Sequence, residues 1–158
     1  MKQSHTSGAD YTGKNVNIAI VSARFNGEIV ESMRVAAHQT LLDKEVDKNN
    51  IKHMYVPGAF ELPLACKMLA ETKKYDAVIA LGCVIRGDTP HFDYVCSSSA
   101  EGIQQASLET NIPIAFGVLT TDTTEQALER SSSTNLEHNK GSDMALCVLE
   151  MINVLKSI

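Results

Sequence analysis

The sequence lacks several features that would indicate a membrane, an oxidising compartment or a nucleic acid. No apolar run approaches the length that spans a bilayer, and no signal peptide opens the chain. No two cysteines form a C-x-x-C pair. Basic residues are outnumbered, because 14 Lys and Arg stand against 19 Asp and Glu, which gives a formal net charge of -5. These absences predict a cytoplasmic protein without a membrane or nucleic-acid partner.

The overall composition of the chain is typical of a globular domain. The chain has 158 residues, of which 44% are apolar and 21% are charged, so we expect one domain with one sizeable core. Residues 1–14 are polar and are predicted to form a loose segment, which leaves 15–158 as the single domain. The four cysteines lie in apolar contexts, where we expect reduced thiols that pack as small hydrophobes. They are Cys66, Cys83, Cys96 and Cys147.

Short apolar runs alternate with segments of helical periodicity. Strands are expected at residues 15–23, 51–58, 75–85 and 112–120. Helices are expected from residue 26, over 61–73 and 95–110, after the capping signature "DTTE" at 122–125, and at the C-terminus. The strands have the composition of buried strands. The alternation therefore predicts an α/β fold in which a four-stranded parallel sheet lies between two layers of helices.

Apolar positions indicate which helix faces pack inward. In the second helix we expect Leu64, Met68 and Leu69 to face the core. The last helix carries an apolar stripe at i, i+4, i+7 and i+11, formed by Met144, Val148, Met151 and Leu155. Helix faces of this kind pack on the sheet of an α/β fold.

The segments that follow the expected strands are chemically specific rather than generic turns. In chain order they are "SARFN", "VPGAFE", "CVIRGDTPH" and "FGVLTTDT". In open parallel sheets, ligands bind beyond the carboxyl ends of the strands. These segments are therefore the expected functional site.

Within "RGDTPH", the residue types predict a helix that begins at a ligand. Pro90 fits the first helical position and favours an extended Thr89, which can act as the N-cap. The free amides of that helix end would point past Gly87 and Asp88 and attract an anion. His91 would lie in the first turn, where the positive helix end favours the neutral imidazole that accepts a proton. A capped helix with an exposed histidine is the alternative.

The other strand ends add aromatic and charged candidates. Phe25 and Phe60 lie where a ring could stack on a planar ligand, although a core position is the alternative for each. Glu61 falls in the first turn of a helix, where an acid also stabilises the helix dipole. Arg130 and Lys140 flank a polar loop and in isolation would be solvated surface charges.

Taken together, five ordered motifs resemble the lumazine synthase family, whose enzymes catalyse the penultimate step of riboflavin biosynthesis. The motifs are "SARFN", "PGAFELP", "GCVIRGDTPHFDYV", "FGVLTTDTTEQALER" and "NKG". The resemblance covers the chain from about residue 15 to its end. It implies a flavodoxin-like fold, which is a three-layer α/β/α sandwich.

The resemblance implies a reaction and an assembly. A transferase of this family would condense 5-amino-6-(D-ribitylamino)uracil with 3,4-dihydroxy-2-butanone 4-phosphate, giving 6,7-dimethyl-8-ribityllumazine, inorganic phosphate and water. It would need no metal and no organic cofactor, in agreement with a sequence that has no His/Cys spacing of a metal site. Its partners would be small-molecule substrates and copies of itself, in a homopentamer whose active sites lie between subunits.

The resemblance also assigns residues to that site. His91 would transfer protons, Phe25 would stack on the pyrimidine ring, and Glu61 would hold ribityl hydroxyls. The other contacts within the subunit would be Ala59, Phe60, the backbone of Cys83, Val84 and Ile85, and, at the phosphate, Asp88 and Thr89. The residues from the neighbouring subunit would be Phe116, Arg130 and Lys140.

Three alternative functions fit the same expected fold, because a fold does not fix a function. A flavin-binding or nucleotide-binding module should have a phosphate loop rich in Gly, Ser and Thr after its first strand, and "SARFN" is not one. A related riboflavin synthase is disfavoured by the complete "RGDTPH" and "PGAFE" motifs. An inactive shell protein is disfavoured by the presence of His91, Arg130 and Lys140.

The loop at residues 131–138, "SSSTNLEH", bears on assembly. Family members that form icosahedral shells usually have a short turn with glycine there, whereas this loop is longer and has no glycine. A longer loop should alter how the last two helices meet, near the contacts between pentamers. Closure of a shell needs the same angle at every such contact, so we predict a free pentamer.

Overall fold

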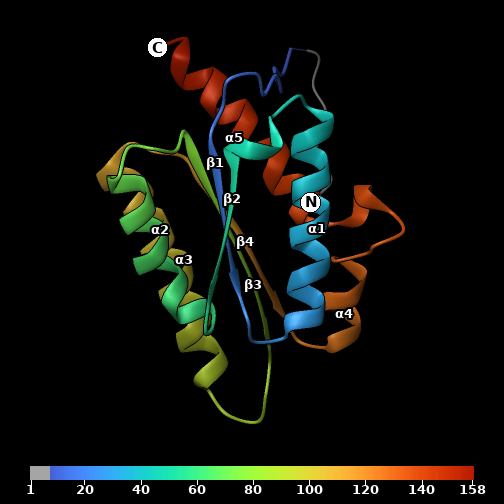
Figure 1. Ribbon diagram of the computed structural model, residues 1–158. Coiled ribbons are helices and arrows are strands. Elements are labelled where there is room, and N and C mark those ends of the chain that lie inside the picture. The colour runs from blue at the N-terminus through green and yellow to red at the C-terminus, as the bar shows by residue number, and fades with distance from the viewer. Residues whose placement is uncertain (1–7) are drawn as a thin grey trace.

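Four parallel strands form the central sheet of the computed structural model, which describes residues 8–158 (Figure 1). In sheet order they are β2 (Ile51–Val56), β1 (Ile18–Ala23), β3 (Ala77–Ile85) and β4 (Ile114–Thr121). All three pairings are parallel. Within the described residues, β1 and β3 are therefore the central strands, and β2 and β4 are the edges.

Two layers of helices cover the sheet. The α-helices of the described chain are α1 (Gly27–Asp43), α2 (Leu62–Glu71), α3 (His91–Thr110), α4 (Thr124–Glu129) and α5 (Lys140–Lys156). The α2 and α3 helices lie on one face, whereas α1 and α5 lie on the other and α4 lies beside α1 (Figure 1). This is the three-layer α/β/α sandwich predicted from the sequence. No helix in the described range has the length and apolarity needed to cross a membrane.

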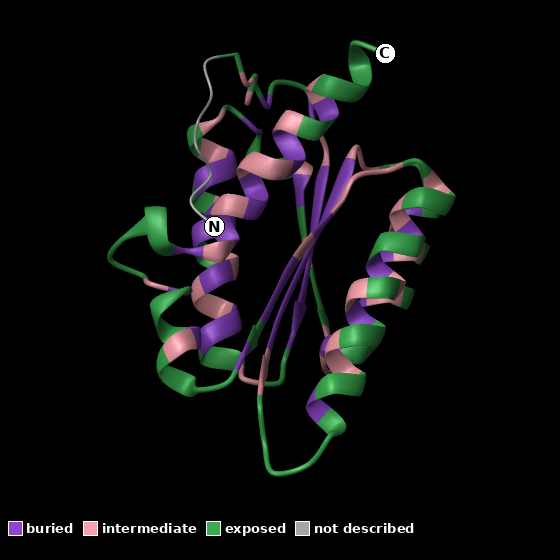
Figure 2. Cartoon of the chain, turned by 180° about the vertical axis from the view of Figure 1, so that it is seen from behind, coloured by how far each residue is buried: buried purple, intermediate pink, exposed green. Residues whose placement is uncertain are grey.

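The central strands are buried on both faces because a helical layer covers each face (Figure 2). Every residue of β1 is buried, and only the last two residues of β3 are not. Successive side chains alternate between the layers, so that Ile18 and Ile20 pack with α1 and α5. Ala19 and Val21 pack instead with α2 and α3. The covered strand predicted at 75–85 is thus confirmed.

The α1 and α5 helices approach closely where α5 begins. Gly141 faces the backbone of Met33, and an added Cβ atom would lie 2.6 Å from the carbonyl carbon of Met33. In addition, the hydroxyls of Thr40 and Ser142 share a buried hydrogen bond of 2.8 Å. Packing against α1 therefore fixes the position of Lys140, the first residue of α5.

The predicted inward face of α2 is wrong for two of its three residues. Leu64 and Met68 are 70% and 60% exposed, and only Leu69 packs, half-buried, against the core. The buried residues of α2 are Leu62, Cys66 and Ala70. Leu62 fixes the rotation of the helix because it docks against β3 at Gly82, where an added Cβ atom would lie 3.2 Å from Leu62 Cδ1.

The apolar stripe of α5 is buried only in its first half. Met144 and Val148 are buried, but Met151 and Leu155 are 39% and 43% exposed. The C-terminal end of α5 extends past the edge of the sheet (Figure 1), so the sheet no longer covers it. The expected helix is confirmed, and its exposed end is a consequence of its length.

Part of the segment expected to be loose contacts the domain. The Gly13 N–H donates to the Lys44 carbonyl at 2.9 Å, at the end of α1. The Asn153 side chain donates to the Asp10 carbonyl at 3.0 Å, near the end of α5. The described part of the segment is thus tied to both helices, and residues 1–7 lie outside the described range.

Candidate functional site

The carboxyl ends of the strands lie along one edge of the sheet, at the bottom of Figure 1. Ala23 and Val56 end β1 and β2 and are paired in register, so these two strands finish at the same level. We call the segments that follow the strands, at residues 24–26, 57–61, 86–91 and 122–123, the strand-end edge. It contains the segments in which the sequence predicts most of the site.

Phe25 is held at this edge by its backbone and leaves its ring free. The Phe25 N–H donates to the Pro57 carbonyl at 3.1 Å, which ties the β1–α1 turn to the segment after β2. The side chain is 70% exposed. The interpretation of Phe25 as a core residue is therefore excluded, and its ring is accessible to a planar ligand.

Asn26 connects the same turn to β3, and the sequence interpretation did not single it out. Its backbone adopts the left-handed conformation, with φ 54°, directly before α1. Its Nδ2 donates to the Cys83 carbonyl at 2.8 Å, so it occupies a backbone group that was expected to face a ligand. The left-handed backbone at Asn26 could have been predicted from its residue type, because asparagine adopts this conformation more readily than most residues.

The "GAFE" segment forms a single 3₁₀ turn, Ala59–Glu61, before α2. Ala59 is buried, and the Ser99 hydroxyl on α3 lies 3.0 Å from its carbonyl. Phe60 is 60% exposed and Glu61 is exposed. The turn is therefore anchored at Ala59, and the two side chains expected to contact substrate project from it.

The end of β3 passes from the core into an exposed loop. Cys83 is buried, Val84 and Ile85 are half-buried, and residues 86–90, which we call the 86–90 loop, are all exposed. The loop extends beyond the sheet in Figure 1 before α3 begins at His91. The backbone of residues 83–85 therefore lies where the covered part of the strand ends.

The start of α3 agrees with the prediction to within one residue, because the helix begins at His91 and its N-cap is Pro90 rather than Thr89. Thr89 Oγ1 accepts a hydrogen bond from the His91 N–H at 3.4 Å, and Pro90 has helical backbone angles. The side chains of Asp88, Thr89 and His91 are all exposed at the tip of this segment. The structure thus brings His91 and the expected phosphate-binding residues into one continuous segment at the strand-end edge.

The cysteines are free, but two of them are less buried than expected. Cys66 and Cys83 are buried, whereas Cys96 and Cys147 are half-buried. Burial raises the pKa of the Cys83 thiol to about 11 and that of Cys66 to about 12. Cys83 is therefore a protonated thiol near neutral pH and is unsuited to act as a nucleophile, although it borders the site.

Arg86 ties the 86–90 loop to the end of β4. Its Nε donates to Asp122 Oδ1 at 2.8 Å, and its Nη1 donates to Asp93 Oδ1 at 3.2 Å. Its guanidinium carbon also lies 4.2 Å from the centre of the Phe92 ring. The sequence interpretation gave Arg86 no role, because its contact with Asp122 depends on the pairing of β3 with β4.

The capping signature before α4 is displaced by one residue. The N-cap is Thr123, which forms a capping box with Gln126, rather than Asp122 with Glu125. The Asp122 carboxylate is therefore not used as a cap and instead binds Arg86.

Phe116 is not part of the strand-end edge of its own chain. It lies within β4, paired with Ala80, and its side chain is half-buried against the α2–α3 layer. Because β4 is an edge strand of the described sheet, this part of the chain borders the outside of the domain.

Arg130 and Lys140 are brought together at the neck of a loop. The Lys140 N–H donates to the Arg130 carbonyl at 2.8 Å, and Ser131 pairs with Asn139 beside it. The Arg130 guanidinium donates to the Gln126 carbonyl at 2.9 Å. Among the described residues, no hydrogen bond or ion pair joins either cation to His91 or to the 86–90 loop.

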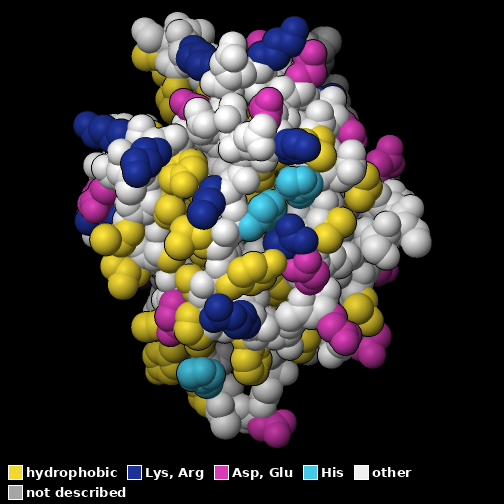
Figure 3. Space-filling model, viewed as in Figure 1, with side chains coloured by type: hydrophobic (Ala, Val, Ile, Leu, Met, Phe, Trp, Pro, Cys, Tyr) yellow, Lys and Arg dark blue, Asp and Glu magenta, His cyan; other side chains and the backbone are white. Residues whose placement is uncertain are grey.

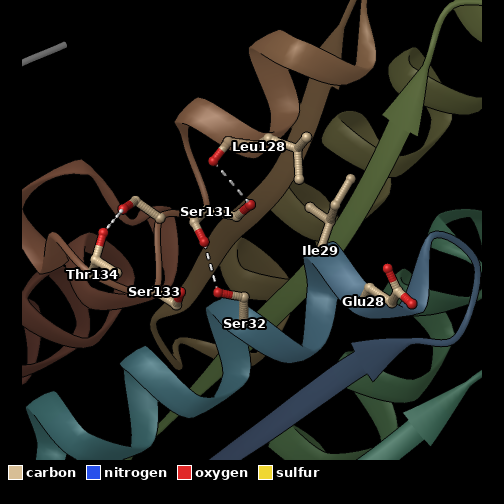
Figure 4. A pocket seen from close by; sticks show the side chains of 8 residues that line it. Glu28, Ile29, Ser32, Leu128, Ser131, Ser133 and Thr134 are labelled. Carbon is tan, nitrogen blue, oxygen red and sulfur yellow. Dashed lines mark hydrogen bonds between the residues drawn. The ribbon is translucent and has the colours of Figure 1, made fainter.

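Two cavities lie near that loop rather than at the strand-end edge. The first, shown in Figure 4, has a volume of about 310 Å³ and lies between the start of α1 and the chain after α4. It is lined by Glu28, Ile29, Ser32, Leu128 and residues 131–134. The second is lined by Glu125, Leu128, Glu129, Ser132, Asn135 and His138. None of the predicted site residues lines either of these two cavities.

In the described range, no group of three or more His, Cys, Asp or Glu side chains is arranged to hold a metal ion.

Comparison with known families gives a match over most of the chain. The model of the family described as 6,7-dimethyl-8-ribityllumazine synthase matches residues 15–156. The matched range includes all four strands and every candidate residue named above.

Proposed function

The chain belongs to the 6,7-dimethyl-8-ribityllumazine synthase family, and from this premise we propose that it catalyses the lumazine-forming condensation of riboflavin biosynthesis. The substrates are 5-amino-6-(D-ribitylamino)uracil and 3,4-dihydroxy-2-butanone 4-phosphate. The products are the lumazine, inorganic phosphate and water. The observation that supports the proposal most directly is the grouping of Phe25, Phe60, Glu61 and His91 on the exposed strand-end edge.

The pyrimidine substrate binds to the segments that follow β1, β2 and β3. The exposed ring of Phe25 stacks on the pyrimidine, while Ala59 and Phe60 contact it from the turn before α2. The Glu61 carboxylate accepts hydrogen bonds from the ribityl hydroxyls. The backbone of residues 83–85 holds the heterocycle where β3 leaves the core, although Asn26 already uses the Cys83 carbonyl.

The reaction needs proton transfer but no protein nucleophile. The amine of the uracil attacks the ketone of the butanone phosphate, and loss of water then gives an imine. Elimination of phosphate follows, and attack of the ribitylamino nitrogen on the remaining carbonyl then closes the second ring with loss of a second water. His91 moves protons in these steps. The protonated thiol of Cys83 is consistent with a chemistry in which the substrate itself supplies the nucleophile.

The phosphate group is held from two sides. Asp88 and Thr89 provide the contacts from the loop before α3, near the positive end of that helix. Arg130 provides a guanidinium from a neighbouring subunit and stabilises the leaving phosphate. The remaining acceleration comes from holding both substrates in register.

We propose that the neighbouring subunit completes the site in a homopentamer. Phe116 packs against the α2–α3 layer, and no described hydrogen bond or ion pair joins Arg130 or Lys140 to His91 or the 86–90 loop of the same chain, which supports a role of these residues in the site of the next subunit. Leu64 and Met68 add exposed apolar surface on α2, of the kind that subunit contacts cover. Phe116 then covers the ring that Phe25 stacks on.

The reaction is tested by incubating the purified protein with both substrates and following lumazine formation optically, with each substrate omitted in turn. Product that requires both substrates supports the proposed synthase. Dismutation of added lumazine, without product from the two substrates, supports a riboflavin synthase instead. Tight flavin binding without turnover supports a binding module, and no activity supports an inactive shell protein.

The shared site is tested by mixing two inactive variants. His91→Ala and Arg130→Ala subunits are unfolded together and refolded into mixed oligomers. If the two residues act in one site from different subunits, about a quarter of the sites in random mixtures regain both residues. If both act within one chain, mixing restores no activity.

We also propose that the enzyme works in the cytoplasm without a metal or an organic cofactor, as the family relationship implies. Activity that survives exhaustive dialysis against a chelator supports the second statement. Loss of activity that one added metal restores contradicts it.

A further inference from the structure

Arg86 is the best-connected residue of the strand-end edge. Its backbone N–H donates to the Thr121 carbonyl at 2.9 Å, which continues the β3–β4 ladder by one residue. Its side chain joins three other positions, because it bonds Asp122 beyond β4, bonds Asp93 in α3 and covers the Phe92 ring. One guanidinium therefore links the end of β4 to the first turn of α3.

The 86–90 loop between these points has few other restraints. Gly87 has no atom within 4 Å of the position of an added Cβ. Asp88 and Thr89 are exposed, and the one side-chain hydrogen bond described within the segment joins Thr89 to the His91 N–H. Phe92 is buried and anchors the helix that follows. The Arg86 side chain is therefore the main tie between the loop and the neighbouring strand in the described chain.

We propose that Arg86 is a positioning residue for the reaction, which holds the 86–90 loop and the first turn of α3 where His91 and the loop amides act on the phosphate-bearing substrate. This inference rests on the proposed function. A direct role of Arg86 in phosphate binding is disfavoured, because its Nε and Nη1 each donate to a carboxylate and Phe92 covers one face of the guanidinium. Together Arg86, Asp93 and Asp122 carry a net negative charge, which would repel a phosphate.

The geometry requires arginine rather than any cation. The planar guanidinium donates in two directions and stacks on an aromatic ring at the same time, whereas a lysine ammonium is a compact point charge. Arg86→Lys keeps the positive charge but removes the planar guanidinium, and Arg86→Met removes both the charge and the guanidinium. Lys67→Met is the matched control, because Lys67 is also shared by two carboxylates, Glu71 at 2.9 Å and Glu109 at 3.5 Å.

The first measurement is hydrogen–deuterium exchange of residues 86–94 in the assembled protein. We expect the amides of this segment to exchange about five-fold faster or more in Arg86→Met, because a local tie is lost. The Lys67→Met control should leave the exchange of the segment unchanged. Unchanged exchange in Arg86→Met overturns the proposal, and this result does not depend on which reaction the protein catalyses.

The second measurement separates positioning from direct phosphate binding. Misplacement of a catalytic group by about 1 Å lowers rates up to about 100-fold, so Arg86→Met and Arg86→Lys should lower kcat about 10-fold to 100-fold, with the KM of the pyrimidine little changed. Asp122→Ala should reproduce part of this loss, and the double variant should be no worse than Arg86→Met. Full kcat in Arg86→Lys, or additive losses in the double variant, overturns the proposal.

If Arg86 instead bound the phosphate directly, Asp122→Ala would not impair the reaction. Removal of the carboxylate would then free the guanidinium, so that the KM of the butanone phosphate stays the same or falls. If the wild-type protein forms no lumazine, the proposed function fails. The exchange measurement still decides whether Arg86 orders the segment.

Discussion

Mild acid should destabilise this protein through one pair of histidines. His38 Nδ1 on α1 lies 3.0 Å from His53 Nε2 on β2. The face shown in Figure 3 carries two adjacent histidine side chains. Arg34 Nη1 lies 3.4 Å from His53 Nδ1 and can only donate, so His53 Nδ1 must accept. His53 Nε2 then carries the proton that bonds His38. The arrangement therefore requires both imidazoles to be neutral.

The surroundings of the pair oppose protonation. Burial, and then the positive charges of Arg34 and His38, lower the pKa of His53 to about 4, and only Glu31 acts in the other direction. Burial and Arg34 also lower the pKa of His38. Glu31 is already engaged, because it accepts hydrogen bonds from Arg34 and from the Tyr55 hydroxyl. No carboxylate in the described cluster is thus left to neutralise a second proton.

The size of the effect follows from the change in the pKa of His53. Its ordinary value is 6.5, so between pH 6.5 and about 4 the unfolded chain binds a proton that the native state excludes. The contribution of neutral His53 to the free energy of unfolding is therefore fully present above pH 6.5, and it is lost as the pH falls toward 4. One pH unit corresponds to about 1.36 kcal/mol, so the loss at pH 5 is about 2 kcal/mol before solvent screening. Because His53 is only half-buried, we expect about 1 kcal/mol.

The assay compares the free energy of unfolding in urea at pH 7.5 and pH 5.0, at one fixed protein concentration because oligomers dissociate on unfolding. His53→Gln cannot titrate, so its stability should fall less than that of the wild type over this range, by about 1 kcal/mol. His138→Gln, at an exposed position, should behave as the wild type does. An equal fall in the wild type and in His53→Gln refutes the reasoning.

Four further predictions concern catalysis, packing and assembly. His91→Ala should lower kcat about 10²-fold to 10⁴-fold and leave a residual rate, because substrate positioning survives; an unchanged kcat removes His91 from proton transfer. Arg130→Ala should raise the KM of the butanone phosphate, and weakened binding of the pyrimidine alone, with each substrate varied in turn, would contradict this role. Gly141→Ala should lower the free energy of unfolding by roughly 1–3 kcal/mol, since its Cβ would meet the backbone of Met33. Gly27→Ala, whose Cβ would meet nothing, is its control, and equal stability of the two variants contradicts the packing argument. Light scattering should detect a free pentamer, and hollow particles of about sixty chains at neutral pH would show that the loop argument is wrong.

The sequence predicts the strands and the strand-end segments well because buried parallel strands have a strong apolar signal. Residues 77–85 are apolar almost throughout, and the change in chemistry at Arg86 marks where the strand leaves the core. The start of α3 was predictable to within one residue for a similar reason, since helix starts depend on neighbouring residue types, although the N-cap is Pro90 rather than Thr89.

The sequence does not predict features that depend on how elements dock. The α2 helix has apolar residues on more than one face, and only the contact of Leu62 with Gly82 decides which face is buried. The pairing of Arg86 with Asp122 depends on the register of β3 and β4, which apolar patterns do not fix. The cap before α4 was ambiguous by one residue, because "DTTE" and "TTEQ" both match a capping box.

The strand order also governs what a ribosome exposes during synthesis. β1 is bonded on one side to β2 and on the other to β3, so its second neighbour emerges only after residue 77. A nascent chain that has reached the end of β2 can form a two-stranded unit with α1, but it still presents to solvent the other edge of a strand that is fully buried in the native sheet. Throughout the translation of α2, this unpaired edge can recruit other strands, and identical chains on one message are the nearest source of them.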